Sequence, residues 1–115
     1  MDKWGPPKWK EIHATSLHED PTKLRSLLKT IDRDIPCPIC KHHLRQYMKM
    51  HPIRADTDTI RWAINFHNNV NVRIGKRSVP YKEALELVSK QNTQSKACKS
   101  VLAGVLASIL VWNIV

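Results

Sequence analysis

Hydrophobic positions recur at helical spacing in four successive segments of the chain. The pattern predicts helices at about residues 6–17, 21–35, 38–50 and 59–74, and a short fifth helix at 81–89. No segment alternates between apolar and polar residues as a half-buried strand does. The sequence therefore predicts an all-α fold, a four-helix bundle with a short fifth helix.

Prolines and a glycine mark the expected helix ends. Pro6 and Pro7 suit the first turn of a helix, where a missing N–H costs nothing. Pro36 and Pro52 end the second and third helices, because the residue before a proline avoids the helical conformation. Gly75 is the expected C-cap of the fourth helix.

The last part of the chain differs in composition from the rest. Residues 91–100 are polar and small, which is typical of a linker, and residues 101–115 are continuously apolar or small. We therefore expect a domain at 1–90, a linker, and a hydrophobic C-terminal helix. That helix would be about 22 Å long, shorter than a bilayer requires. The lysines before it still suit a C-terminal membrane anchor, with the domain on the cytoplasmic face. The alternative is a helix packed on the bundle or on a partner.

The chain has 115 residues, enough for one domain, and a formal net charge of +9. A basic surface suits nucleic acid, an anionic membrane or a phosphate-bearing ligand. The charges are scattered, however, so a solvated surface is an equal alternative. The first seven residues lack the apolar core of a signal peptide, and none is expected. Three cysteines are too few for a disulfide-rich secreted scaffold.

Polar side chains occupy otherwise apolar faces of three predicted helices: His13 on the first, His67 and Asn71 on the fourth, and Cys40, His43 and Tyr47 on the third. A buried polar group without a partner costs about 1–3 kcal/mol. These groups could satisfy one another, hold a metal or line a polar ligand. Each one alone is explained as a core residue with a partner, but together with a neighbouring C-x-x-C they indicate a site.

The Cys37-Pro38-Ile39-Cys40 motif begins a predicted helix. Free N–H groups and the helix dipole stabilise a thiolate at such a position. Two intervening residues let the sulfurs form a disulfide or bind one metal ion. The motif alone is therefore equally consistent with a redox pair and a zinc knuckle.

Taken together, the motifs between residues 4 and 76 resemble the Erv/ALR family of FAD-linked sulfhydryl oxidases, and in particular its small viral members. The matching residues are Trp4-Gly5-x-x-x-Trp9-x-x-x-His13, Cys37-Pro38-Ile39-Cys40, His51-Pro52, and Trp62-x-x-x-x-His67-Asn68-Asn69-Val70-Asn71-x-x-Ile74-Gly75-Lys76. The H-N-x-V-N element is the most specific part of the match.

The resemblance implies a flavin held inside the bundle. Its motif positions assign the flavin and its adjoining chain to Gly5, Trp9 and His13, and the adenine, ribose and phosphates to His67, Asn68, Val70, Asn71 and Lys76. His43 and Tyr47 are further candidates for cofactor contacts. The misplaced polar residues would then be partners of FAD.

The resemblance also implies separate roles for the two sulfurs. Cys40 would face the flavin, and Cys37 would take the incoming substrate thiolate in a thiol–disulfide exchange. Electrons would pass from the cysteine pair through FAD to molecular oxygen, giving hydrogen peroxide. The enzyme would thus be a thiol oxidase that forms disulfide bonds in partner proteins.

Two departures from the family pattern change this expectation. Many members carry a structural disulfide at the position of Ile64, and this chain has no cysteine between residues 41 and 97. Small viral members share this reduced form, which points to a viral source and to a location in host cytoplasm or virion. Cys98 cannot form a shuttle disulfide within one chain, so it is expected to be idle or modified.

The expected electron donor is a dithiol protein, thioredoxin-like or a viral redox partner, with a C-x-x-C of its own. Family members usually dimerise through their first two helices, so a non-covalent homodimer is expected.

Two rival interpretations explain less. A zinc module would use Cys37, Cys40 and two of the histidines His42, His43 and His51, on a basic domain that binds nucleic acid. It leaves the tryptophan–glycine and H-N-x-V-N elements without a role. A non-enzymatic membrane scaffold would make the tail the functional part. We expect neither a metal nor a nucleic-acid partner.

Overall fold

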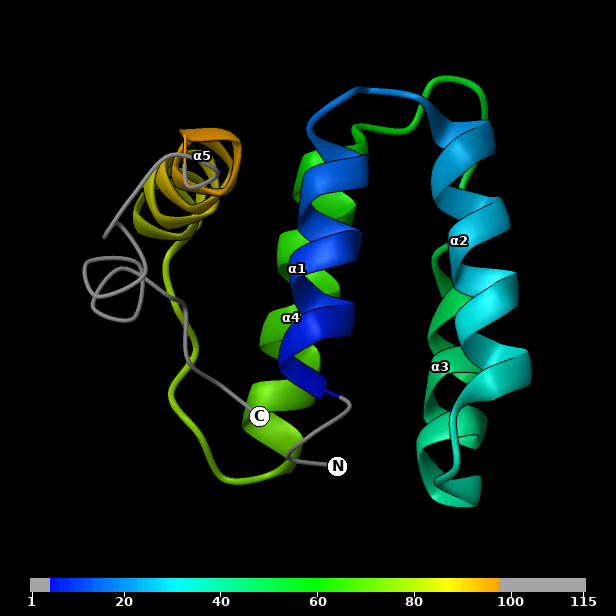
Figure 1. The fold of residues 1–115 in the computed structure, drawn as a ribbon. Helices are drawn as coiled ribbons and strands as arrows, with labels where there is room; N and C mark the ends of the chain where they lie inside the picture. Colours follow the sequence, from blue (N-terminus) through cyan, green and yellow to red (C-terminus); the bar gives the residue numbers. More distant parts are fainter. Residues whose placement is uncertain (1–4, 98–115) are drawn as a thin grey trace.

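The computed structural model describes residues 5–97, and the side chains of residues 8–92, as an all-helical fold (Figure 1). Its helices are α1 (Gly5–Ser16), α2 (Pro21–Asp34), α3 (Pro38–Met50), α4 (Thr59–Arg73) and α5 (Tyr81–Ala97). No strand occurs within residues 5–97, so the predicted all-α class is confirmed. Trp4, Cys98 and the hydrophobic tail lie outside the described residues, and the predictions made for them stay predictions.

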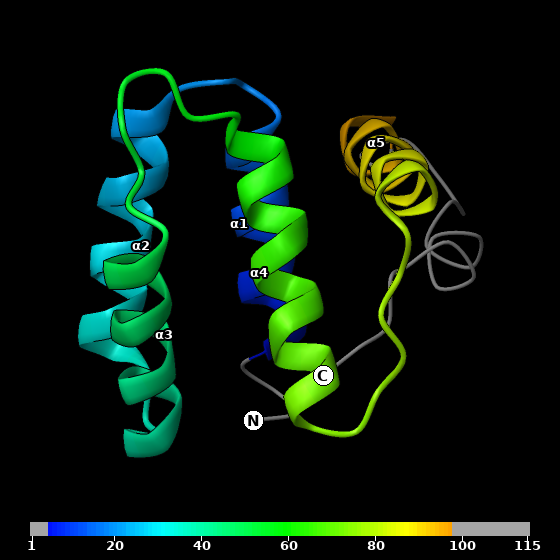
Figure 2. The same ribbon diagram turned by 180° about the vertical axis from the view of Figure 1, so that it is seen from behind.

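The helices form two antiparallel pairs and one outlying helix. Figures 1 and 2 show α1 beside α4 and α2 beside α3, with α5 on the opposite side of the α1/α4 pair from α2 and α3. α5 runs across the other helices and contacts both α4 and α1. α4 is thus placed between the cysteine-bearing half of the molecule and α5.

Local signals set the helix ends at almost all the predicted positions. The Asp20 carboxylate accepts hydrogen bonds from the N–H groups of Thr22 and Lys23, at 3.0 and 3.2 Å, and caps α2. At the end of α4, Gly75 has a φ of +82°, which glycine adopts without strain. The Lys76 N–H then donates to the Asn71 carbonyl at 2.7 Å, as in a Schellman motif. Gly75 therefore ends α4 as predicted, one residue beyond the C-cap Ile74.

The fifth helix is longer than predicted. It continues from Tyr81 to Ala97, whereas the sequence prediction ended it at residue 89 and assigned 91–100 to a linker. Residues 91–97 are therefore helical. The run contains no glycine or proline, and Gln91 and Asn92 continue, half-buried, the inward face that Ala84 and Val88 begin. The predicted helix end at residue 89 was wrong, because a polar composition alone does not stop a helix. The division into a domain, a linker and a tail stays a prediction.

Two hydrophobic clusters meet at α4. The larger one lies between α1, α2, α3 and α4, and consists of Ile12, Leu24, Leu28, Ile31, Leu44, Ile53, Trp62, Ala63 and Phe66. The smaller one joins α4 to α5 and consists of Ile60, Ile64, Val79, Ala84 and Val88.

Candidate active site

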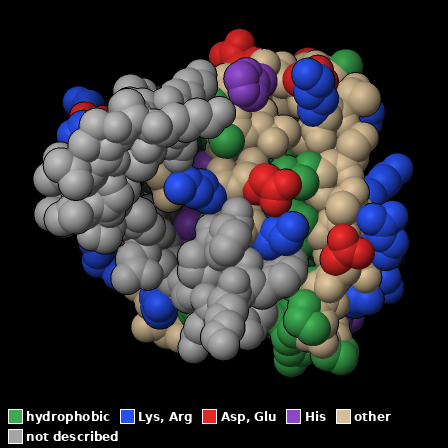
Figure 3. All heavy atoms as spheres, in the orientation of Figure 1, with side chains coloured by type: hydrophobic (Ala, Val, Ile, Leu, Met, Phe, Trp, Pro, Cys, Tyr) green, Lys and Arg blue, Asp and Glu red, His purple; other side chains and the backbone are tan. Residues whose placement is uncertain are grey.

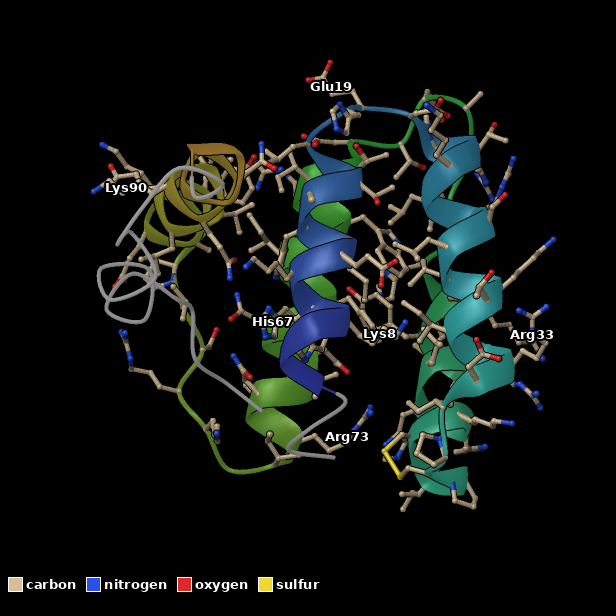
Figure 4. All side chains as sticks on the ribbon, in the orientation of Figure 1. Lys8, Glu19, Arg33, His67, Arg73 and Lys90 are labelled. Carbon is tan, nitrogen blue, oxygen red and sulfur yellow. A yellow bond between two sulfur atoms is a disulfide. The ribbon has the colours of Figure 1, made fainter. Side chains whose placement is uncertain are left out.

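Cys37 and Cys40 are joined by a disulfide at the start of α3 (Figure 4). Cys37 is the N-cap of α3, and its Sγ accepts a hydrogen bond from the Cys40 N–H at 3.3 Å. The proline at the first helical position, Pro38, fixes this start. When the disulfide is reduced, the N-terminal N–H groups and the dipole of α3 stabilise a thiolate at Cys37.

An apolar cavity of about 300 Å³ opens beside the disulfide, between the two helix pairs. Its size falls within the range of small-molecule sites. Cys40 lines this cavity and Cys37 is absent from its lining. The other lining residues are Lys8, Trp9, Ile12, Leu28, Ile31, Ile35, Ile39, His43, Leu44, Phe66, Val70, Arg73 and Ile74. Two of them, Lys8 and Arg73, bring positive charge to the cavity, and Figure 4 shows both between the helix pairs.

Trp9 connects this cavity to a buried polar cluster. Its indole lines the cavity and stacks on the His67 imidazole, with ring centroids 3.8 Å apart and planes inclined by 6°. Phe66 packs against the indole, with the two ring centroids 5.3 Å apart. Two aromatic side chains, Trp9 and Phe66, thus form part of the cavity wall on the α1/α4 side, with their planes inclined by 52°.

His13 and His67 form a hydrogen-bonded pair in the core. Their Nε2 and Nδ1 atoms are 2.6 Å apart, and the residues are 2% and 1% exposed. Burial lowers the pKa of His13 to about 3. Burial, and then the proximity of His13, lowers the pKa of His67 as well. Both rings are therefore neutral at pH 7, each with one donor and one acceptor nitrogen.

Three asparagines on α4 differ in how their amides are satisfied. Asn68 donates to the Val79 carbonyl at 2.7 Å and accepts from the Val79 N–H at 2.8 Å. Asn71 is fully buried, and neither its Oδ1 nor its Nδ2 has a hydrogen-bond partner among the described residues. The buried Oδ1 of Asn69 also lacks one there. Unpaired buried amides are costly, and a ligand with complementary donors and acceptors would remove that cost.

The remaining predicted site residues are spread around this centre. His43 is half-buried and lines the cavity, and desolvation, then the Arg73 charge, lowers its pKa. Tyr47 packs on Trp62 and Phe66 instead, and burial raises the pKa of its phenol. Lys76 is exposed just beyond the end of α4.

The structure brings Trp9, His13, His43, His67 and Val70 to the cavity or to the pair beside it. The amide of Asn68 is engaged in holding the segment before α5, which the sequence did not reveal. Gly5 is the first residue of α1.

Sequence reasoning missed most of the cavity lining. Ile12, Leu28 and Phe66 were not among the predicted site residues, because helical periodicity does not separate a packed face from one that borders a void. Lys8 and Arg73 carried a weak signal, as each is a cation directly beside a residue of the family motif.

Two further findings concern the rival interpretations. Within the described residues, no group of three or more His, Cys, Asp or Glu side chains could hold a metal ion. The zinc interpretation therefore has no ligand set among them. None of the helices between residues 5 and 97 is both long and apolar enough to cross a membrane.

A disulfide at a helix N-terminus, with one sulfur on an apolar cavity, makes this an all-helical protein with a candidate redox site. Comparison with known proteins identifies its family. Residues 8–96 match the Erv1 / Alr family model, and the chain belongs to this family.

Its relatives include viral and plant proteins. A FAD-linked sulfhydryl oxidase of African swine fever virus is 30% identical over 93 residues, covering 72% of this chain and 77% of the relative. A FAD-linked sulfhydryl oxidase of Oryza sativa subsp. japonica is 26% identical over 103 residues, covering 82% of this chain and 53% of the relative. No solved structure gives a significant match.

Proposed function

We propose that this protein is a FAD-linked sulfhydryl oxidase that forms disulfide bonds in partner proteins. The observation that carries the proposal is the Cys37–Cys40 disulfide, with Cys40 alone of the two cysteines on the wall of the apolar cavity. Membership of the Erv1 / Alr family and the names of the relatives, which are FAD-linked sulfhydryl oxidases, support the same activity.

The residues present fit FAD. The apolar cavity, lined by the Trp9 indole and by Cys40, would suit a flat aromatic ring system. Asn71 and the His13–His67 pair supply buried polar atoms beyond Trp9 for the polar part of the cofactor. Lys76 and Arg73 bring positive charge to the same end of α4, where they would suit a pyrophosphate. When bound, FAD supplies the two-electron acceptor that oxidises the reduced cysteine pair and delivers the electrons to oxygen, giving hydrogen peroxide.

The cysteine pair performs the exchange with substrate. A substrate thiolate attacks the Sγ of Cys37, forming a mixed disulfide and breaking the Cys37–Cys40 bond, so that Cys40 leaves as a thiolate. The second substrate thiolate then attacks the substrate sulfur of the mixed disulfide, and Cys37 leaves. Two electrons pass from the substrate dithiol to the cysteine pair, and each substrate thiol releases its proton to solvent or to a departing thiolate.

The start of α3 favours this assignment of roles. Cys37 is the N-cap residue, so the Cys40 N–H that now contacts its Sγ would stabilise the departing thiolate. A stabilised thiolate leaves faster and thus resolves the mixed disulfide. Cys40, on the cavity wall, is in turn placed to pass electrons inward.

Spectroscopy and oxygen uptake test the proposal. The purified full-length protein should be yellow, with a flavin spectrum, and should consume oxygen when given dithiothreitol. Cys40→Ala should keep the flavin and lose the oxygen uptake, whereas Cys98→Ala, the matched control, should keep both. A colourless protein, or full turnover in Cys40→Ala, would contradict the proposal.

Trapping of the mixed disulfide tests the roles of the two sulfurs. In Cys40→Ala, Cys37 remains without its resolving partner and should accumulate a mixed disulfide with an activated substrate thiol. Cys37→Ala should form much less of it, because Cys40 faces the cavity. Equal trapping by the two variants would remove the distinction between outer and inner sulfur.

We also propose a homodimer, and membrane association through residues 101–115, in the host cytoplasm or in the virion if the source is a virus. Sedimentation velocity would show a dimer as twice the 13.3 kDa chain mass. The large hydrophobic side chains that the described surface exposes, Ile39, Met50, Val72 and Ile74, all lie outside α1 and α2. A dimer through those two helices would thus use a mainly polar surface.

Binding to lipid vesicles tests the membrane anchor. Deletion of residues 101–115 should end any such binding, and unchanged binding would contradict the anchor.

A further inference from the structure

The acidic residues are distributed unevenly along the chain. All ten Asp and Glu residues lie outside two segments, residues 35–55 and 59–82. These segments contain α3, which begins at the disulfide, and α4, which forms a wall of the cavity. Their cationic residues are Lys41, Arg45, Lys49, Arg54, Arg61, Arg73, Lys76, Arg77 and Lys82.

Part of this positive charge is neutralised by neighbouring segments. Arg45 pairs with Asp32, Arg61 with Asp58, and Arg77 with Glu83, at 2.8, 3.7 and 3.6 Å. The exposed acid nearest in sequence to the disulfide, Asp34, pairs with Arg33 at 3.2 Å.

Two cations near the redox centre, Lys41 and Arg73, remain without such pairs, whereas Lys8, which also lines the cavity, pairs with Glu11 at 3.4 Å. Lys41 lies one helical turn after Cys37, and its N–H donates to the Cys37 carbonyl at 3.0 Å. Arg73 lines the cavity on which Cys40 lies. Neither side chain forms an ion pair with a described residue. Because a bound pyrophosphate would compensate Arg73, Lys41 is the cation that stays uncompensated beside the disulfide in the FAD-loaded enzyme.

Exposed apolar side chains lie on the same face. Ile39, inside the C-x-x-C, is 64% exposed, and Ile74 is 48% exposed. Both also border the cavity on which Cys40 lies. Figure 3 shows hydrophobic side chains gathered at the lower end of the molecule, with Lys and Arg side chains along the adjoining edge. Figure 4, in the same orientation, places the disulfide at that lower end.

We propose that this face selects protein substrates whose reactive cysteine has an apolar neighbour and flanking Asp or Glu residues. The inference rests on the proposed oxidase function and specifies its substrate class. Opposite charges across an interface raise the association rate and suppress partners of like charge. Ile39, inside the C-x-x-C, and Ile74, on the cavity that Cys40 lines, supply apolar contact surface, and the surrounding cations supply the selection.

Paired peptide substrates test the proposal with the FAD-loaded full-length enzyme. Each peptide has the same two cysteines and the same apolar neighbour, and is flanked by either glutamates or lysines. We expect kcat/KM, measured as oxygen uptake at low salt, to be about tenfold higher for the glutamate peptide. The ratio should approach one in high salt, because the charges are then screened.

Two charge reversals locate the effect on the molecule. Lys41→Glu reverses a charge beside the disulfide. Lys90→Glu makes the same change on α5, on the other side of the molecule (Figure 4). Each peptide rate is divided by the rate with dithiothreitol, which removes any general effect on the redox centre. Lys41→Glu should abolish most of the preference, Lys41→Gln should reduce it by a smaller amount, and Lys90→Glu should leave it nearly intact.

The outcomes separate this proposal from the oxidase function itself. Failure to oxidise dithiothreitol would reject the oxidase function. Oxidation of dithiothreitol with equal rates for the two peptides would reject only the substrate selection. Equal effects of Lys41→Glu and Lys90→Glu would mean that net charge acts rather than this face. Stronger inhibition by a short single-stranded oligonucleotide than by a glutamate peptide without cysteines would assign the face to nucleic acid instead.

Discussion

One face of α4 has two unlike halves. Ile60 and Ile64, in its first half, pack into a closed apolar cluster against α5 and the segment before it. His67 and Asn71, on the next two turns of the same face, are just as deeply buried but polar. Ile64 and Asn71 are both 0% exposed, so burial alone does not distinguish the halves.

The two halves differ in whether their buried side chains have the contacts or hydrogen-bond partners that they need. The apolar half needs only packing, which α5 supplies. In the polar half the Asn71 amide has no hydrogen-bond partner among the described residues, and burying such a group costs about 1–3 kcal/mol. A bound ligand with complementary polar atoms would remove this cost. The first half thus stabilises the fold, and the second contains the polar residues to which the proposed function assigns the cofactor.

The largest expected effect is a loss of stability at low pH, and it arises from the two histidines next to or within the polar half, His13 and His67. The folded protein keeps His13 and His67 neutral because burial lowers the pKa of both, whereas the unfolded chain protonates them below about pH 6.5. Stability is then fully present above pH 6.5 and is lost as the pH falls. We expect a loss of about 2 kcal/mol per histidine between pH 7 and pH 5, or about 4 kcal/mol for the pair.

Urea unfolding at several pH values measures this loss. His67→Gln, which keeps a neutral polar side chain beside His13, should halve it. Equal stability at pH 7 and pH 5 would show that the pair is accessible to protons in the folded protein.

The next effect concerns the apolar half. Ile64→Ala removes a fully buried side chain from a closed cluster, so it should lower the free energy of unfolding by about 3 kcal/mol. Val70→Ala, on the cavity side of α4, is the comparison. Val70 is half-buried beside a space that already exists, so its truncation should cost less than about 1 kcal/mol. Chemical denaturation of the two variants measures both values, and equal costs would contradict the contrast between closed and open packing.

Much of the fold could be predicted from the sequence because its signals are local. Prolines and a glycine set the ends of α2, α3 and α4, and these act on the backbone of their own segment. The end of α5 was missed because its polar residues were taken as a linker, although none of them breaks a helix. Local composition says little about where a polar helix stops when a buried face continues.

The site was predictable to a smaller extent. The C-x-x-C and the misplaced polar residues indicated a redox site with a ligand, but not which residues border its cavity. The void lies between helix pairs far apart in sequence, and helical phase does not reveal whether a face meets side chains or space. Asn68 illustrates the same limit, because its partner Val79 is brought to it only by the return of the chain toward α5.

A smaller effect is expected at Asn68, which holds the apolar half closed. Asn68→Ala removes two hydrogen bonds to the Val79 backbone, and it should cost about 2 kcal/mol because the N–H and C=O of Val79 lose their partner. Amide hydrogen exchange should accelerate in α5 more than in α2. Asn65→Ala, an exposed position on the same helix, should change neither quantity. Unchanged exchange in α5 would show that the apolar cluster alone holds that helix.

The smallest expected change in stability is at Asn71, and it has the opposite sign. Asn71→Leu replaces an amide without partners by an apolar group of similar shape, which should raise the stability of the flavin-free protein by about 1 kcal/mol. The same variant should lose bound flavin, measured as flavin per chain after gel filtration. Asn68 and Asn71 are three residues apart on one helix, yet truncation of one amide should destabilise the protein while replacement of the other stabilises it. Destabilisation by Asn71→Leu would show that the amide has partners within the protein. Full retention of flavin would place Asn71 outside the binding half of α4.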